Sequence, residues 1–162
     1  GTGIILNNRL TGFSLDSASP NIIEPGKRPA HTLNAFTAVN PDGTLHLVGG
    51  TPGANIQVQT NLQLIVNIVD LKMNVQEATE APRWQHLKAP GQSSSEETGS
   101  GVLEIENRVS VAVLDELRAK GHDVKALTEW GHGSSVQLMQ VLANKTYAFG
   151  SDPRCEGHAC GI

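Results

Sequence analysis

A glycine-rich turn runs directly into a regular helical pattern in GGTPGANIQVQTNLQLIVN, residues 49–67, and this segment constrains the fold more than any other. Gly50, Gly53 and the small Ala54 allow the backbone to bend tightly, and Asn55 is of a type that commonly caps helices. The spacing of apolar residues then predicts a helix over residues 55–71. The stripe expected to face the core consists of Val58, Leu62, Ile65, Val66 and Val69.

Such a turn leaves a run of backbone N–H groups unobstructed at the positive end of a helix. Groups in this position can bind an anion, or stabilise a carbonyl oxygen that becomes negatively charged during a reaction. A plainer interpretation is that the glycines only provide the geometry of a strand-to-helix turn. The turn by itself is compatible with both interpretations.

The composition is that of a globular protein, and we expect residues 1–162 to form a single domain. A formal net charge of −4 without a Lys/Arg cluster disfavours nucleic acid or an anionic membrane as partner. No apolar run is long enough to span a membrane. Cys155, Cys160 and His158 are too few ligands for a closed zinc site, so we predict free or locally paired thiols, no metal and no cofactor.

Two local patterns predict structure directly. NPDG at residues 40–43 is typical of a turn between strands, because Pro presets φ and Gly accepts a positive φ. Asn74 with Glu77 three residues later is a capping-box pattern that begins a helix ending near Pro82. The other expected elements are strands at 4–6, 32–39, 44–49, 103–105, 136–141 and 146–149, loops at 9–29 and 91–101, and a helix at 111–120 capped by Ser110 and ended by Gly121. Paired strands beside consecutive helices predict a layered α+β fold.

Five segments together resemble the small subunit of the gamma-glutamyltransferase family: GIILNNRL, PGKRPAHTLNAF, VNPDGTLHLVGGTPGANIQVQTNLQLIVNIVD, NVQEATEAPRW and SDPRCEGHACG. The resemblance implies an N-terminal-nucleophile hydrolase with a four-layer αββα sandwich. In this family a precursor cleaves itself, and the freed N-terminal threonine of the small subunit becomes the nucleophile. The large subunit from the same precursor stays bound as the partner of a heterodimer.

The resemblance also implies site residues. In glutamyl-transferring members two adjacent glycines of the turn supply the N–H groups of an oxyanion hole, and the matching positions here are Gly53 and Ala54. Alanine keeps its N–H, so the donor survives the exchange. Asp152 and Arg154 belong to a closing motif of the family, where we expect an internal ion pair.

Substrate-contacting positions depart from those members. Their Gln and Asp, which hold the substrate's α-ammonium group, are replaced by Arg9 and Gly12, and a Ser pair that holds its α-carboxylate is replaced by His31 and Thr32. A cationic Arg cannot accept a hydrogen bond from an ammonium group, and Gly12 has no side chain. The changes favour the acylase-like branch, which includes cephalosporin acylases and oxamate amidohydrolases. Arg9 as a solvated loop cation and His31 as an ordinary strand histidine are the alternatives.

We therefore expect a small subunit of an amidohydrolase or acylase that forms an acyl-threonine intermediate on a small-molecule amide. We do not expect Thr2 to be the nucleophile, because Gly1 precedes it and the resemblance places GTG well downstream of the nucleophile, which is expected on a missing upstream segment. The chain alone should then be inactive. The alternatives are a true gamma-glutamyltransferase (glutathione hydrolase) and a non-catalytic binding fragment. The sequence does not distinguish a cytoplasmic from a periplasmic location.

Overall fold

The computed structural model describes residues 1–88 and 101–158 and divides the chain into two compact units, Gly1–Leu33 and Asn34–Ile162. Each unit is described by itself, and the predicted single domain stays a prediction. The expected loop at 91–101 lies outside the described residues except for Gly101, which begins a strand. Cys155 forms no disulfide with any residue in the described ranges, and Cys160, with which a local pair was an alternative, lies outside them.

The first unit consists mainly of loops, as predicted for residues 9–29. It contains one short 3-10 helix, η1 (Arg9–Gly12), and an isolated bridge between Ser14 and Ile22. The strand predicted at residues 4–6 is wrong, since Ile5 is 94% exposed and residues 1–8 form no regular element. A strand needs a neighbour for its backbone N–H and C=O groups, and no described residue pairs with this segment.

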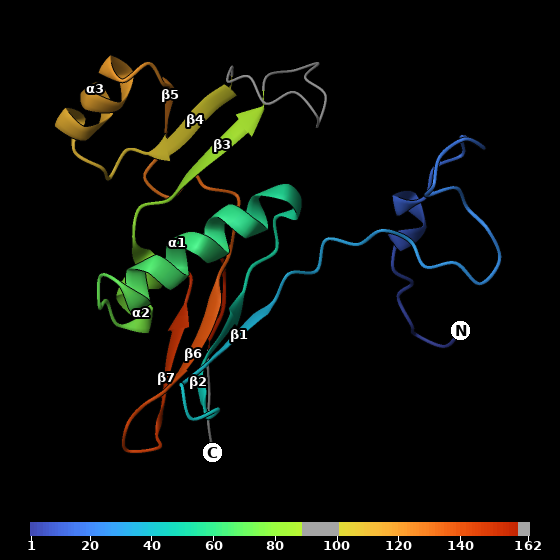
Figure 1. The fold of residues 1–162 in the computed structure, drawn as a ribbon, viewed down its shortest axis with the longest axis horizontal. Helices are drawn as coiled ribbons and strands as arrows, with labels where there is room; N and C mark the ends of the chain where they lie inside the picture. The colour runs from blue at the N-terminus through green and yellow to red at the C-terminus, as the bar shows by residue number, and fades with distance from the viewer. Residues whose placement is uncertain (89–100, 159–162) are drawn as a thin grey trace. The chain divides into compact units, whose positions relative to one another are not determined.

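The second unit contains a four-stranded antiparallel sheet in the order β1-β2-β6-β7 (Figure 1). Its strands are β1 (Phe36–Val39), β2 (Leu45–Gly50), β6 (Gln137–Val141) and β7 (Tyr147–Ser151). The predicted hairpin turn between β1 and β2 is confirmed: the Gly43 N–H donates to the Asn40 carbonyl at 2.9 Å, and Gly43 has φ 83°. The predicted closing hairpin corresponds to β6 and β7.

Two helices, α1 (Gln57–Val69) and α2 (Val75–Glu80), cover one face of this sheet. Their buried side chains pack with those of the sheet in a core of Leu47, Leu64, Ile68, Val75, Ala78, Val136 and Leu138. The capping box is confirmed, because the Asn74 side chain accepts from the Gln76 and Glu77 N–H groups while Glu77 accepts from the Asn74 N–H.

The stripe of α1 that we expected in the core is wrong. Val58, Leu62 and Val69 are 64%, 55% and 41% exposed, whereas the face that meets the sheet carries Gln57, Thr60, Asn61, Leu64 and Ile68. Apolar residues occur on both faces of this helix, so periodicity could not choose between them. The buried face is decided by Leu64 and Ile68 together with a hydrogen bond from the Asn61 amide to the Asn34 carbonyl at 2.7 Å.

A second sheet of three strands has the order β3-β4-β5, with β3 (Trp84–Lys88), β4 (Gly101–Glu106) and β5 (Asp123–Leu127). β4 includes the strand predicted at 103–105, whereas β3 and β5 were missed. The helix α3 (Val111–Ala119) connects β4 to its parallel neighbour β5. Ser110 caps this helix through its hydroxyl, and Gly121 follows its end with φ 93°, as predicted. No helix in the described ranges is long and apolar enough to cross a membrane.

Candidate active site

The glycine turn follows β2 and leads into a 3-10 helix, η2 (Ala54–Ile56), before α1 begins. Gly53 has φ 136°, a backbone conformation open to glycine but strained for a residue with a side chain. Ala54 has φ 48°, in the left-handed region that costs an alanine about 1 kcal/mol or more. The prediction that Asn55 caps the helix is wrong, since neither η2 nor α1 has a side-chain cap.

The missing cap leaves backbone donors available. Among residues 1–88 and 101–158, no acceptor takes a hydrogen bond from the N–H groups of Gly53, Ala54 and Asn55. The Gly53 carbonyl is occupied, because it accepts from the Ile56 N–H at 3.1 Å. Consecutive free N–H groups before a helix form a site for an anion or a developing oxyanion.

The start of the turn is anchored by Thr51, whose residue exposure is only 9%. Its hydroxyl accepts from the Ser135 N–H at 3.0 Å and donates to the Pro52 carbonyl at 2.7 Å. These bonds tie the turn to the loop that precedes β6.

The loop before β6 is held by a buried cluster of charged side chains, which lies between the two sheets. The Arg83 guanidinium contacts the carboxylate of Asp152 and donates to the Ser134 hydroxyl at 2.9 Å. Arg154 bonds Glu106 at 2.6 Å and Asp152 at 3.0 Å, which confirms the internal ion pair expected between Asp152 and Arg154. The four charged side chains are at most 2% exposed.

The two carboxylates of this cluster remain ionised. Burial by itself would raise the pKa of Glu106, but hydrogen bonds from Arg154 and Arg108 outweigh it and lower that pKa to about 2. Burial likewise opposes ionisation of Asp152, and the charge of Arg83 is the largest influence that lowers its pKa. The positive charges of the two arginines therefore balance the two carboxylates, and the cluster holds together the segments that carry them.

His132 lies beside the cluster, with Nδ1 2.7 Å from the Ser134 hydroxyl. Burial, followed by the positive charge of Arg83, lowers its pKa from 6.5 to about 4. The imidazole is therefore neutral near pH 7, and the folded protein must take up a proton against this environment when it is acidified.

We expect acid to destabilise the fold through His132. Between pH 6.5 and about 4 the unfolded chain holds a proton on this residue and the folded chain does not, so stability falls as pH falls. The difference between the two pKa values corresponds to about 3 kcal/mol. Denaturant unfolding at several pH values should show a shallower acid dependence for His132→Asn than for the parent. An identical dependence in both proteins would contradict this assignment.

The three predicted substrate residues lie in the first unit. Arg9 Nη1 is 3.5 Å from the Thr32 hydroxyl, so the structure brings these two side chains together. The His31 ring is exposed and its Nδ1 accepts from the Leu33 N–H at 3.3 Å. Gly53 and Ala54 belong to the second unit.

Gly12 owes its identity to packing. A Cβ atom placed on Gly12 would lie 2.5 Å from the Ala30 carbonyl oxygen, closer than real Cβ atoms come. The segment that ends η1 and the segment that precedes His31 are therefore in direct contact. An acidic side chain at position 12 would require this contact to open.

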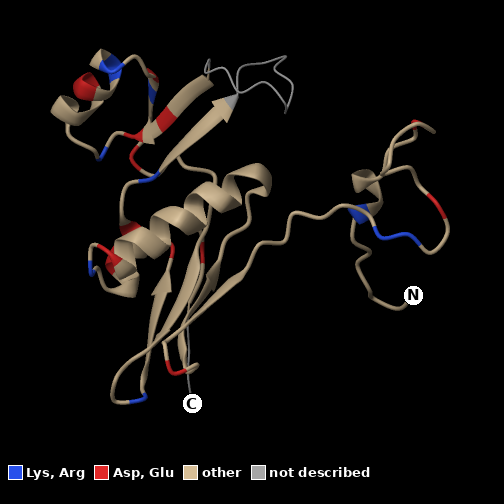
Figure 2. Cartoon of the chain, in the orientation of Figure 1, with Lys and Arg blue, Asp and Glu red and all other residues tan. Residues whose placement is uncertain are grey.

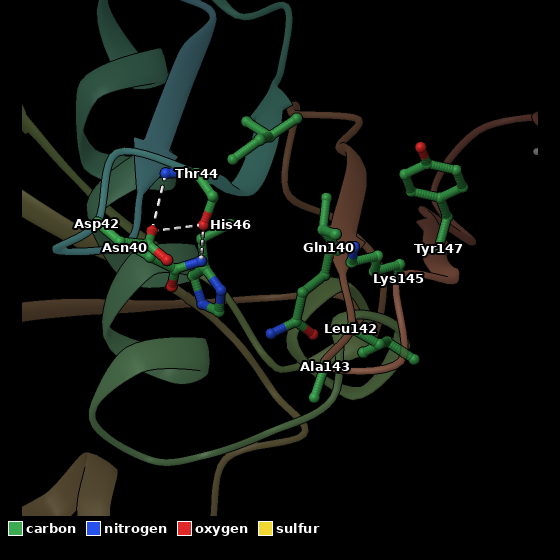
Figure 3. Close-up of a pocket in the computed structure, with 11 residues that line it drawn as sticks. Asn40, Asp42, Thr44, His46, Gln140, Leu142, Ala143, Lys145 and Tyr147 are labelled. Carbon is green, nitrogen blue, oxygen red and sulfur yellow. Dashed lines mark hydrogen bonds between the residues drawn. The ribbon is translucent and has the colours of Figure 1, made fainter.

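A groove of about 790 Å³ lies at the far end of β2 from the glycine turn, where the β1–β2 and β6–β7 turns meet (Figure 3). His46, Lys145 and Tyr147 line it. Asp42, also at its wall, accepts from the Thr44 N–H at 2.9 Å and hydroxyl at 2.6 Å, so its carboxylate stabilises the turn. None of the predicted site residues lines this groove.

Sequence reasoning missed the residues that support the turn. Thr51 lies in the glycine-rich segment 49–67, but its hydrogen-bond partner Ser135 is distant in the chain. Arg83, Glu106 and His132 are single polar residues in unremarkable surroundings, and no spacing connects them. Only the fold reveals that they meet.

Comparison with known proteins shows which protein family this chain is related to. The family model described as gamma-glutamyltranspeptidase matches residues 1–162. The chain is 34% identical to the oxamate amidohydrolase proenzyme of Klebsiella pneumoniae and 36% identical to the glutathione hydrolase proenzyme of Escherichia coli, covering 99% and 94% of this chain. The crystal structure of cephalosporin acylase from Bacillus halodurans matches with a TM-score of 0.74 and 28% identity, over 97% of this chain and 28% of that one.

The chain belongs to the gamma-glutamyltranspeptidase family. This is a family of N-terminal-nucleophile amide hydrolases, and its α+β fold agrees with the structure. The resemblance stated from the sequence is confirmed, including its acylase and oxamate amidohydrolase relatives. The chain spans 29% of the Klebsiella pneumoniae relative and 26% of the Escherichia coli relative.

Proposed function

We propose that this chain is part of the small subunit of an amidohydrolase, in which Gly53 and Ala54 form the oxyanion hole. The observation that carries this proposal is the turn at Gly53–Ala54, whose N–H groups have no acceptor among the described residues and whose Pro52 and Gly53 carbonyls are both hydrogen-bonded. A nucleophile outside this chain, expected to be a threonine, attacks the amide carbonyl. The turn stabilises the tetrahedral oxyanion, the amine leaves, and water hydrolyses the acyl-enzyme.

We propose a short carboxylated amide such as oxamate as the substrate, bound by Arg9, His31 and Thr32. The contact between Arg9 and Thr32 supports a site for an anionic group, since a guanidinium favours carboxylates. The packing of Gly12 against Ala30 leaves no room for the acidic side chain that an α-ammonium group would require. The name of the Klebsiella pneumoniae relative agrees with this substrate class.

Glutathione hydrolysis is the second candidate, favoured by the 36% identity to the Escherichia coli relative. The enzyme that contains this chain should hydrolyse oxamate with a higher kcat/KM than a gamma-glutamyl anilide. Arg9→Gln should reduce kcat/KM for oxamate at least tenfold, because a charge-assisted contact to the carboxylate is lost. Lys120→Gln, a matched change of an exposed cation at the C-terminal end of α3, should leave it unchanged. A preference for the glutamyl compound would overturn the substrate assignment, and no turnover of either would favour a non-catalytic binding fragment.

We further propose that a partner large subunit completes a four-layer αββα sandwich. The sheet face opposite α1 is apolar and open, with Val39 and Tyr147 61% and 60% exposed and a groove of about 430 Å³ between Val48, Met139 and Phe149. Neither α1 nor the four strands of this sheet carry Lys, Arg, Asp or Glu (Figure 2). Uncharged apolar surfaces of this kind mark interfaces.

The partner proposal predicts the behaviour of the chain expressed alone. We expect it to aggregate or to remain partly unfolded, and to become soluble when the rest of the precursor is co-expressed. Size-exclusion chromatography and denaturant unfolding measure this. A soluble monomer with a cooperative unfolding transition would count against a required partner.

A further inference from the structure

The hydroxyl of Thr51 contacts the same peptide group that carries the Gly53 N–H. The Pro52 carbonyl and the Gly53 N–H are the two ends of one planar trans peptide, and they point in opposite directions. A hydrogen bond that fixes the carbonyl therefore also fixes the direction of the N–H. The Thr51 hydroxyl donates such a bond to the Pro52 carbonyl at 2.7 Å.

The hydroxyl is itself held in place. It accepts the Ser135 N–H at 3.0 Å, so its single proton is directed to the Pro52 carbonyl. Ser135 follows Ser134, which the buried Arg83 holds at 2.9 Å. The Thr51 side chain thus connects the turn to the loop before β6, which the buried Arg83 holds. Its residue exposure of 9% leaves little access for competing water.

The next peptide is fixed by a different contact. The Gly53 carbonyl accepts from the Ile56 N–H at 3.1 Å, and this bond within η2 sets the direction of the Ala54 N–H. The two adjacent donors are therefore oriented by different contacts, one within η2 and one from a side chain. The side chain also polarises its peptide, because hydrogen bonds in a chain strengthen one another.

We propose that Thr51 is a positioning residue that orients and polarises the Gly53 N–H toward the oxyanion. This inference rests on the proposed function of the turn. Thr51 touches no reacting atom in this assignment. Its effect appears where negative charge develops, so it changes the rate of the chemical step more than the binding of the substrate.

Thr51→Val removes the hydroxyl and keeps the shape of the side chain. Measured in the mature enzyme with oxamate and with a gamma-glutamyl anilide, it should lower kcat about three- to tenfold on the substrate that is turned over faster. KM should change less than twofold, and Thr51→Ser should restore kcat to within twofold. Thr60→Val is the matched control: Thr60 is a fully buried threonine of α1 whose hydroxyl has no partner among the described residues. It should leave both constants unchanged.

The pair Thr51→Ser and Thr51→Ala differs only by the hydroxyl and gives the same comparison if the valine variant fails to fold. Equal kcat in Ser and Ala variants, or a loss expressed only in KM, would overturn the positioning role. Replacing the Pro52–Gly53 amide by an ester removes the N–H itself. This variant therefore distinguishes a failure of the oxyanion-hole assignment from a failure of the Thr51 positioning role. A normal kcat in the ester protein refutes the oxyanion hole and this inference with it. A low kcat in the ester protein beside a normal kcat in Thr51→Val refutes this inference alone.

Discussion

Replacing Arg83 with methionine should lower the free energy of unfolding by about 3–5 kcal/mol, the range typical of breaking a buried ion pair. Asp152 would lose a buried guanidinium partner, and the Ser134 hydroxyl and the Thr79 carbonyl would lose donors at 2.9 Å and 2.6 Å. Methionine fills much of the volume, so the loss reports on the charge and the hydrogen bonds. Denaturant unfolding of the protein that contains this chain measures it.

The control for Arg83 is an ion pair of similar length on the surface. Lys120, which directly follows α3, lies 2.7 Å from Glu116 of α3, both are well exposed, and Lys120→Met should cost less than about 1 kcal/mol. Arg83→Lys keeps the charge but loses the planar fork, and should fall between the two. If Arg83→Met costs no more than Lys120→Met, the cluster does not hold the two sheets together.

Local chemistry made part of the fold predictable. The turn at Asn40–Gly43 and the caps at Asn74 and Ser110 each depend on contacts within four residues, and all three are confirmed. The same reasoning failed for Asn55, because the positive φ values of Gly53 and Ala54 insert a 3-10 turn where a capped helix was expected.

Features that depend on contacts between segments distant in the sequence could not be predicted. Both faces of α1 satisfy a helical pattern, and only the sheet beneath it determines that Leu64 is buried and Leu62 exposed. The strand expected at residues 4–6 has no neighbour among the described residues. The cluster around Arg83 joins segments 69 residues apart in sequence, a distance at which no spacing rule applies.

In the candidate site, too, the local features were predicted and the contacts between distant segments were not. The Gly53–Ala54 turn was found because its glycine, its proline and the following helix are contiguous. The contact by which Thr51 supports this turn was not found, because it depends on Ser135, which lies in the loop before β6. The relation of Arg9, His31 and Thr32 to the turn stays a prediction from the family resemblance.

The Gly53 N–H is expected to contribute about 10²–10³ in kcat, the usual loss when one oxyanion donor is removed. Side-chain substitutions cannot test this cleanly. Gly53 has φ 136°, which proline, fixed near −65°, cannot adopt, and a Cβ here would lie 2.7 Å from Ile56. An ester in place of the Pro52–Gly53 amide removes the donor and keeps the shape of the backbone.

The most direct measurement compares this ester with an ester at Pro25–Gly26, the same dipeptide at an exposed turn where Gly26 has φ 75°. Both proteins should fold and mature, as thermal melting and self-cleavage would show. With saturating substrate, the Pro52–Gly53 ester should lower kcat about 10²–10³-fold with a much smaller change in KM, and the Pro25–Gly26 ester should leave kcat unchanged. An unchanged kcat in a matured Pro52–Gly53 ester protein would contradict the oxyanion hole and return the turn to a purely structural role.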